Sequence, residues 1–277
     1  MLKQRVLTSL VLVPLVLAAI FALPSKWFAV LVGVVILLAA LEWSRMMQHA
    51  PRLWQYLAVV AMFAGIVALY ALYAWSPGPV GSGVVIAGAA WWLIVTAWVF
   101  YYPAGLPSGR VLPLRKLLAG WLLLVPAWAA VSVLHARGDT GPSLVLLLFV
   151  IVWVADIAAY FAGHAWGRHR LAPHISPGKT VEGAAGGVLA SVLVGLAGGA
   201  LLGASGAALA ALAVLVLIVA LVSIVGDLAV SMFKRHSQIK DSGGLLPGHG
   251  GLLDRIDSLM AAAPVFVFGL DLLGLFA

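Results

Sequence analysis

"GAALAALAVLVLIVALVSIVGDLA", residues 206–229, is an apolar stretch in which Asp227 is the only charged residue. A helix needs about 20 apolar residues to cross the hydrocarbon core of a bilayer, so this stretch is long enough to do so. Most of the chain resembles it: 64% of the 277 residues are hydrophobic and only 9% are charged. A water-soluble protein of this size carries far more charge. The sequence therefore predicts an all-α protein that is solvated mainly by lipid.

Eight further stretches have the same character, which predicts a polytopic integral membrane protein with about nine transmembrane helices. A glycine-rich turn around Gly203–Gly206 divides the seventh from the eighth. The first has the charge pattern of a signal peptide but no small-x-small cleavage site before Pro24, so we expect it to remain as a helix. The nine expected spans are 6–23, 27–43, 54–75, 83–102, 117–135, 143–166, 181–204, 206–229 and 259–276.

The basic residues predict how the chain is oriented. Fourteen of the sixteen lysines and arginines lie before the first span or in every second connection after it, and only Lys26 and Arg137 lie on the other side. The positive-inside rule makes the basic side cytoplasmic, with the N-terminus inside and the C-terminus outside. Because these bases flank apolar spans, the net charge of +7 favours an anionic membrane surface or substrate over nucleic acid. The absence of cysteine excludes disulfides, Cys-ligated zinc and thiol catalysis.

The acidic residues Asp156, Asp227 and Asp271 lie inside expected spans. An ionisable group in a membrane costs several kcal/mol unless it is paired or hydrated. Asp271 is alone near the outer end, and a polar contact between helices is the simpler interpretation for it. Asp227 lies near the inner end of its span, where four of the nine acids fall between residues 227 and 257. That position favours a metal or substrate role.

Asp254 and Asp257 occur in "LLDRIDSLM", residues 252–260, at the expected start of the last helix. Their spacing of three places both carboxylates on one helix face, where they repel each other. Arg255 is expected to point elsewhere and to neutralise them poorly. A divalent cation with oxygen ligands, Mg²⁺, suits the pair better. The alternative, that both acids merely complement the helix dipole, stays open.

Two basic segments are expected to face the same compartment as these acids. "SMFKRHSQIK", residues 231–240, followed by the glycines of "PGHGG", residues 247–251, predicts a flexible cationic loop. Glycines let backbone N–H groups approach an anion, and lysines and arginines neutralise phosphate oxygens. The second segment is "GRHRLAPHISPGKTVEG", residues 167–183. Its "GKT" is not a phosphate-binding P-loop, because Pro173 occupies the position that requires glycine. Acids beside bases predict a nucleotide–Mg²⁺ site.

The run from Ser231 to Asp257 resembles the signature of the phosphatidate cytidylyltransferase family, also called CDP-diacylglycerol synthases. "DIAAYFAG", residues 156–163, and "SPGKTVEG", residues 176–183, are also similar to segments of that family. The resemblance is densest between residues 150 and 260. The signature fixes twelve positions, and all are filled here: Ser231, Lys234, Arg235, Lys240, Asp241, Pro247, His249, Gly250, Gly251, Asp254, Arg255 and Asp257.

The resemblance implies an enzyme that transfers CMP from CTP to phosphatidic acid, giving CDP-diacylglycerol and pyrophosphate. It further implies Mg²⁺, with the number of cations left open, held by Asp227 and Asp254 and, as a third candidate, Asp257. The implied catalytic residues are Asp227, Asp254 and Lys240. Glu182 is expected to help from the neighbouring loop, and a turn role is the alternative for His249. The implied substrate-binding residues are Ser176, Lys179, Ser231, Lys234, Arg235, Lys240, Asp241, His249 and Arg255.

We expect one polytopic membrane domain, with N-terminal helices in residues 1–140 and the helices and loops that carry the active site in residues 141–277. The resemblance places it in a bacterial inner membrane with a cytoplasmic active site, and suggests a homodimer. A CTP-dependent polyprenol kinase is the nearest alternative, and an ion or anion transporter is an alternative of another class. A transporter predicts carboxylates at the midplane, whereas here they cluster at one edge. A CDP-alcohol phosphotransferase is disfavoured, because Asp254 and Asp257 lack its D-x-x-x-D spacing.

Overall fold

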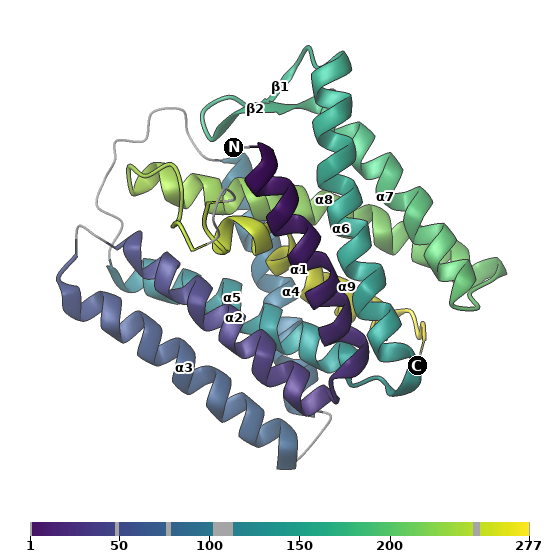
Figure 1. Ribbon diagram of the computed structural model, residues 1–277, viewed down its shortest axis with the longest axis horizontal. Helices are drawn as coiled ribbons and strands as arrows, with labels where there is room; N and C mark the ends of the chain where they lie inside the picture. The colour runs from purple at the N-terminus through teal and green to yellow at the C-terminus, as the bar shows by residue number, and fades with distance from the viewer. Residues whose placement is uncertain (1, 48–49, 76–78, 102–112, 246–249, 277) are drawn as a thin grey trace.

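The computed structural model describes residues 2–47, 50–75, 79–101, 113–245 and 250–276 (Figure 1). Within these ranges the protein is helical apart from connections and one β-hairpin. The all-α prediction is therefore confirmed, and each of the nine described α-helices overlaps one expected span. The helices are α1 (Leu2–Ala22), α2 (Ser25–Arg45), α3 (Arg52–Trp75), α4 (Pro79–Phe100), α5 (Pro113–His135), α6 (Gly141–Trp166), α7 (Val181–Leu201), α8 (Gly206–His236) and α9 (Leu253–Leu272), and a short 3-10 helix, η1 (Gly138–Thr140), precedes α6.

The composition of the helices supports a membrane protein. In the described part of the chain, the seven helices α2 to α8 are long and apolar enough to cross a bilayer, and α1 contributes a shorter apolar segment, Leu10–Ala22. Exposed apolar side chains cover the outside, as on α3 with Leu57, Val60 and Phe63. Such a surface is unstable in water but suits lipid. The number of crossings and their direction stay predictions.

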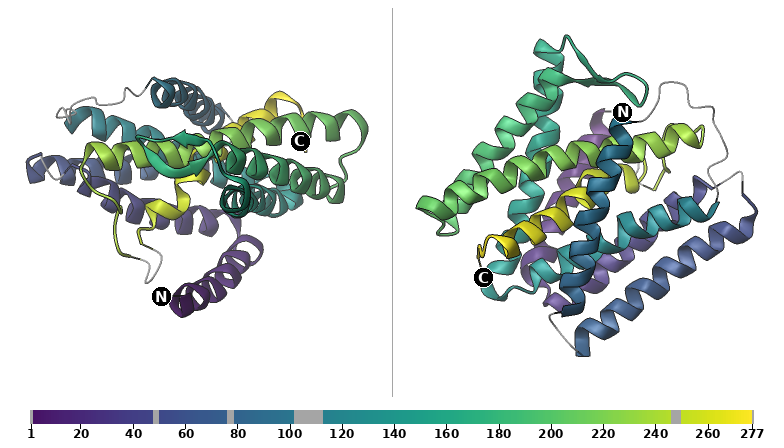
Figure 2. Two further views of the ribbon diagram at one scale, coloured as in Figure 1. Left: turned by 90° about the horizontal axis from the view of Figure 1, so that it is seen from above. Right: turned by 180° about the vertical axis from the view of Figure 1, so that it is seen from behind.

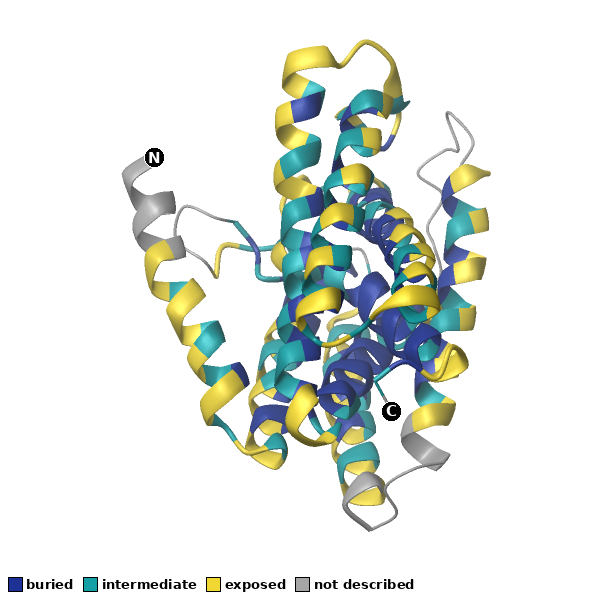
Figure 3. Ribbon diagram, turned by 90° about the vertical axis from the view of Figure 1, so that its right-hand side faces the viewer, coloured by how far each residue is buried: buried dark blue, intermediate teal, exposed yellow. Residues whose placement is uncertain are grey.

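The interior of the bundle is built around α5 and α9 (Figure 3). Most of α5 is buried, and α9 packs against α4, α5 and α8. Buried tryptophans join these helices by hydrogen bonds to backbone carbonyls: Trp92 Nε1 donates to Met260 O at 3.1 Å, and Trp128 Nε1 donates to Ala29 O at 2.9 Å. A buried indole N–H needs such a partner. Because α9 is enclosed by protein, its composition need not suit lipid.

A stripe of small residues joins α7 to α6 and α8. Gly183, Gly187, Ser191, Gly195 and Gly199 are all buried and recur every fourth residue, so they share one face of α7. A side chain at Gly183 would lie 2.8 Å from the Ala159 carbonyl of α6. Small residues allow membrane helices to approach this closely. The tight packing holds both α6 and α8 against this face of α7, and both helices contribute to the cavity described below.

The end of α8 differs from the prediction. Residues 231–236, expected in a flexible loop, continue the helix to His236, so Ser231, Lys234 and Arg235 are helical. The expected span ended at 229 because hydropathy falls there. The physical reason for the continuation is that basic side chains in a last helical turn complement the negative end of the helix dipole. The division between α7 and α8 is confirmed, with Gly203 and Gly206 at positive φ of 92° and 52°.

The segment after α6, expected as a loop, forms an antiparallel hairpin of β1 (Arg170–Ala172) and β2 (Ser176–Thr180). Figures 1 and 2 show this hairpin at the same end of the bundle as the start of α1, while the C-terminus lies toward the opposite end. Near the C-terminal end, Asp271 of α9 pairs with Arg137. Arg137 lies in the connection between α5 and η1, so the polar contact expected for Asp271 is present but joins α9 to a connection and not to another helix.

Candidate active site

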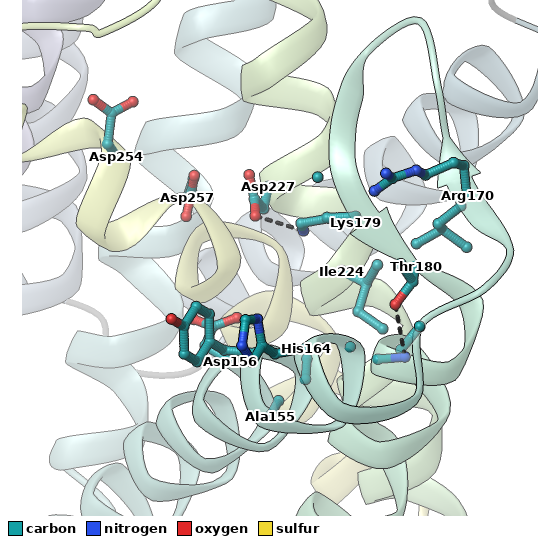
Figure 4. Close-up of a pocket in the computed structure, with 18 of the residues that line it drawn as sticks. Ala155, Asp156, His164, Arg170, Lys179, Thr180, Ile224, Asp227, Asp254 and Asp257 are labelled. Atoms are coloured by element: carbon teal, nitrogen blue, oxygen red, sulfur yellow. Dashed lines mark hydrogen bonds and ion pairs between the residues drawn. The ribbon is translucent and has the colours of Figure 1, made fainter.

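A cavity of about 640 Å³ opens beside the hairpin (Figure 4). Its walls come from α6, the hairpin, the first turn of α7, the C-terminal half of α8, which is predicted to lie toward the cytoplasm, and the start of α9. Acidic and basic side chains face it together, which is unusual in a chain with so few charges. The charged residues that line it are Asp156, Arg170, Lys179, Asp227, Lys234, Asp254, Arg255 and Asp257.

Asp227 of α8 pairs with Lys179 of β2. The Lys179 Nζ lies 2.5 Å from Asp227 Oδ2, and both side chains are about one-quarter exposed, at 27% and 29%. On the other side, the Ser231 hydroxyl, one turn later in α8, donates to Asp227 Oδ1 at 3.3 Å. Asp227 lies nine residues before the end of α8, which places it about 13 Å from that end along the helix axis. The hairpin thus brings Lys179 to a carboxylate well inside the helix.

Asp254 of α9 makes a second, similar pair with Lys234 of α8. The Lys234 Nζ donates to Asp254 Oδ1 at 2.8 Å, and each side chain is only 13% exposed. The backbone N–H of Ser242 donates to the other oxygen, Asp254 Oδ2, at 3.1 Å. Both oxygens of this carboxylate are therefore fixed, one by an ammonium group and one by the chain that leads into α9.

Two further acids complete the set. Asp257 is buried one turn after Asp254, and its Oδ1 accepts from the Ser258 N–H at 2.8 Å. The charges of Asp227 and Asp156 act on Asp257 as like charges. Asp156 lies ten residues before the end of α6, about 15 Å along the helix axis. A cationic partner would relieve the repulsion among these three carboxylates.

The hairpin is held to α7 by local polar contacts. The Thr180 hydroxyl accepts from the Gly183 N–H at 3.1 Å and caps α7, the usual role of threonine at this position. Glu182 accepts from the N–H groups of Arg168 and His169, at 3.0 and 3.2 Å. Arg235 of α8 reaches the hairpin turn, where its Nε donates to Ile175 O at 3.2 Å. Glu182 and Arg235 thus position the hairpin that carries Lys179.

Six of the predicted site residues line the cavity together: Lys179, Asp227, Lys234, Asp254, Arg255 and Asp257. Arg255 was expected to point elsewhere, but the start of α9 turns it toward the same space. Ser176, Ser231, Arg235, Lys240 and Asp241 are outside the set of lining residues, and Lys240 and Asp241 are exposed. Their roles in binding or catalysis stay predictions. His249 lies outside the described residues.

Sequence reasoning gave no site role to Asp156, Tyr160, His164 or Arg170, which also line the cavity. The first three are spaced by four residues and share a face of α6, where the rings of Tyr160 and His164 stack with centroids 6.2 Å apart. This spacing was a usable signal in the segment from 156 to 163. Arg170 was counted only as a topology charge, because the hairpin that turns it toward the cavity was not expected.

The carboxylates fit a hard cation by their chemistry. Oxygen ligands suit Mg²⁺, and Asp227 and Asp254 each already lie against a positive group. Among the described residues, no three acidic or histidine side chains are grouped closely enough to form a complete protein ligand set. Mg²⁺ commonly uses one or two carboxylates and takes its remaining ligands from water and substrate phosphates. The donor set therefore suits a cation that arrives with a phosphate substrate.

Comparison with known proteins agrees with the signature. Residues 3–273 match the sequence profile described as the cytidylyltransferase family. A phosphatidate cytidylyltransferase of Pseudomonas aeruginosa is 47% identical over 287 aligned residues, which cover 96% of each chain. One of Haemophilus influenzae is 37% identical, covering 97% of this chain and 98% of the relative. One of Brucella suis is 40% identical, covering 64% of this chain and 71% of the relative. This chain belongs to the cytidylyltransferase family.

Proposed function

We propose that the protein is a phosphatidate cytidylyltransferase, which makes CDP-diacylglycerol and pyrophosphate from CTP and phosphatidic acid. The observation that carries the proposal is the cavity itself: paired acids and bases gather at one end of a bundle whose outer surface is apolar. A nucleotide needs cations for its phosphates, and a lipid needs access from the bilayer. Both requirements meet at this position, and the relatives named above carry that activity in their names.

The reaction requires no covalent intermediate on the protein. A phosphate oxygen of phosphatidic acid forms a bond to the α-phosphorus of CTP, and the bond from that phosphorus to the bridging oxygen of the β-phosphate breaks. Pyrophosphate leaves with the electron pair of that bond. The lipid phosphate is already ionised near neutral pH, so the protein has only to bring two anions together and stabilise the leaving group.

The basic side chains of the cavity supply the neutralisation. Lys179 comes from β2 and Lys234 from α8, and each is held by a carboxylate, which keeps its ammonium group at a defined place. Arg170 and Arg255 add guanidinium groups, which bind phosphate oxygens in pairs. In this proposal the four bases orient the triphosphate and the lipid phosphate for in-line attack.

Asp227 and Asp254, with Asp257 nearby, are the residues that would hold Mg²⁺. When bound, Mg²⁺ would supply charge neutralisation for the triphosphate and for the leaving pyrophosphate. We further propose that the cavity opens to the cytoplasm of a bacterial cell at the inner membrane, because CTP is cytosolic and the flanking segments are basic.

The test uses purified protein with Mg²⁺, phosphatidic acid and CTP labelled with ³²P at either the α- or the γ-phosphate. The proposed reaction moves the α-label into the lipid fraction and leaves the γ-label in pyrophosphate. The alternative, a CTP-dependent polyprenol kinase, would move the γ-label into a polyprenol and leave the α-label in CDP. Lipid-soluble γ-label, or the absence of lipid-soluble α-label with phosphatidic acid, would contradict the proposal.

A further inference from the structure

Glu42 is a fully buried acid of α2 that the proposed reaction does not use. It lies next to the start of α9 although 212 positions of sequence separate it from Asp254. A buried carboxylate is unfavourable unless hydrogen bonds compensate for its lost hydration. The partners of Glu42 are therefore informative about why an acid is retained here, in a helix whose other charged residues, Lys26 and Arg45, lie at its two ends.

One oxygen of Glu42 joins both described flanks of the segment between α8 and α9. The hydroxyl of Ser242 donates to Glu42 Oε2 at 3.2 Å, and the backbone N–H of Leu253 donates to the same oxygen at 2.8 Å. Leu253 is the first residue of α9, and the residue before it makes no side-chain capping bond. Glu42 thus caps α9 from another helix, and its charge complements the positive end of the α9 dipole.

Ser242 extends this contact to the candidate active site. Its hydroxyl binds Glu42 while its N–H donates to Asp254 Oδ2 at 3.1 Å, and Asp254 Oδ1 accepts from Lys234 at 2.8 Å. A continuous chain of hydrogen bonds therefore runs from Glu42 through Ser242 and Asp254 to Lys234. Neither Glu42 nor Ser242 lines the cavity among its described residues.

Two glycines, Gly243 and the signature residue Gly251, permit this arrangement. A side chain at Gly243 would collide with Glu42 Oε1, and one at Gly251 would lie 2.7 Å from Glu42 Oε2 and still closer to the Ser242 hydroxyl. Both glycines are therefore required by the close approach of the chain to a buried carboxylate. Among the described residues, Glu42 Oε1 has no hydrogen-bond partner, so the donors concentrate on Oε2.

The part of α2 that carries Glu42 is itself firmly held. The next residue, Trp43, donates from Nε1 to Lys116 O at 2.9 Å. The buried Lys116 ammonium donates to Met46 O at 2.6 Å and to the hydroxyl of Ser237, which directly follows α8, at 3.0 Å. The last turns of α2 thus contact α5, the end of α8 and the start of α9, and form a rigid base for the groups that face the cavity.

We propose that Glu42 is a positioning residue for the transfer reaction, which sets the place of Asp254 through Ser242 and through the cap of α9. The inference rests on the proposed function, since it assigns Glu42 to the same site. A residue that stabilises the fold as a whole would change exchange along the entire chain, whereas a positioning residue is expected to act on the two flanks, 242–245 and 250–253. Local order can be measured without substrate and is therefore independent of catalysis.

The first measurement is amide hydrogen exchange of the substrate-free protein in detergent, comparing wild type with Glu42→Ala. Exchange at the Leu253 amide is expected to accelerate about tenfold or more, because this N–H loses its acceptor on Glu42. The Ser242 amide should also exchange faster, because its hydroxyl is no longer anchored and its N–H bond to Asp254 is less firmly held. Peptides from α7 should exchange as in wild type. In the CTP and phosphatidic acid assay, kcat should fall about tenfold with KM for CTP changed less than about threefold, since ground-state binding is retained.

Three variants test the hydrogen-bond explanation. Glu42→Gln keeps an oxygen that can accept from both donors and should restore the local exchange rates to near those of wild type. Ser242→Ala is a smaller change and should also lower kcat about tenfold, so it carries the test if Glu42→Ala fails to fold. Asp271→Asn removes an acid at the opposite end of α9 and should leave both measurements unchanged.

A steric test is independent of these. Gly243→Ala should impair activity because its side chain meets Glu42, and Gly243→Ala combined with Glu42→Ala should be no worse than Glu42→Ala alone, since residues in contact are not additive. Wild-type exchange at Ser242 and Leu253 in Glu42→Ala, or a Glu42→Gln variant as impaired as Glu42→Ala, would overturn the proposal. A wild type that transfers no α-label would instead contradict the proposed function and leave the exchange result standing.

Discussion

Asp227 and Asp254 each lie against a lysine that comes from a different element, and this pairing defines the chemistry of the cavity. Their acidic character and their place near the membrane edge could be predicted from the sequence. Their partners could not, because Lys179 is 48 positions from Asp227 and reaches it only through the hairpin. The sequence therefore identified the acids and suggested that a divalent metal ion neutralises them. In the folded chain, the ammonium groups of two lysines also neutralise them.

The first prediction concerns Asp254. In Asp254→Asn the amide can still accept from the Ser242 N–H, but its NH₂ group then faces the Lys234 ammonium, and the charge that would bind a cation is lost. Transfer of α-label from CTP to phosphatidic acid should fall about a hundredfold or more, since loss of a charge-assisted contact and of a metal ligand act together. Turnover of this variant in detergent, beside wild type, provides the measurement.

Asp139→Asn is the matched control, because Asp139 is an exposed acid in η1, outside the cavity. It should keep wild-type activity. Asp254→Asn should unfold at a lower temperature than wild type, because Lys234 loses its charged partner, so the two proteins are compared at a temperature at which the variant remains folded. Activity of Asp254→Asn close to that of wild type, in protein that remains folded, would remove Asp254 from the cation site.

The helices were the most predictable elements, because lipid leaves few alternatives to a long apolar helix. Each expected span corresponds to a described helix, and the largest errors are the length of α8 and the hairpin. Both errors lie where the chain leaves the apolar region. There, hydropathy no longer distinguishes helix from loop, and helix capping and tertiary contacts decide the structure. The contacts of Arg235 with Ile175 and of Thr180 with Gly183 are of this kind.

The second prediction concerns the joint between β2 and α7. Thr180→Ala removes the hydroxyl that accepts from the Gly183 N–H, whereas Thr180→Ser retains it. Loss of such a cap should lower the free energy of unfolding by about 1 kcal/mol. Because β2 also carries Lys179, Thr180→Ala should lower the rate of cytidylyl transfer more than Thr180→Ser does. Thermal unfolding in detergent and the α-label assay measure the two effects.

Equal stability of the alanine and serine variants would show that the hydroxyl contributes nothing to the start of α7. A large loss of activity in Thr180→Ser would show that shape at this position, and not the capping bond, governs the hairpin. The threonine methyl group packs closely against Gly167, since a Cβ atom added to this glycine would lie 2.8 Å from it. The serine variant removes this methyl group and keeps the hydroxyl, so it separates the packing from the hydrogen bond.

Across the whole molecule, charge and hydropathy have separate roles. Exposed apolar side chains cover the outside of the bundle, whereas the paired acids and bases gather beside the hairpin (Figure 4). The basic connections predict that the hairpin faces the cytoplasm. The fold alone is compatible with either direction of insertion, because a helix bundle crosses a membrane equally well both ways. Orientation is therefore a property of the flanking charges and needs its own test.

The third prediction uses the lack of cysteine in the chain, which makes any introduced cysteine unique. His174→Cys in the exposed hairpin turn and Thr140→Cys in the exposed connection before α6 lie on predicted opposite sides of the membrane. A membrane-impermeant maleimide should label Thr140→Cys in spheroplasts, and His174→Cys only after the membrane is permeabilised. Because each variant alters an exposed residue outside the cavity lining, both should retain cytidylyl transfer. Labelling of His174→Cys from outside, with Thr140→Cys protected, would place the cavity away from cytosolic CTP and contradict the proposed cytoplasmic site.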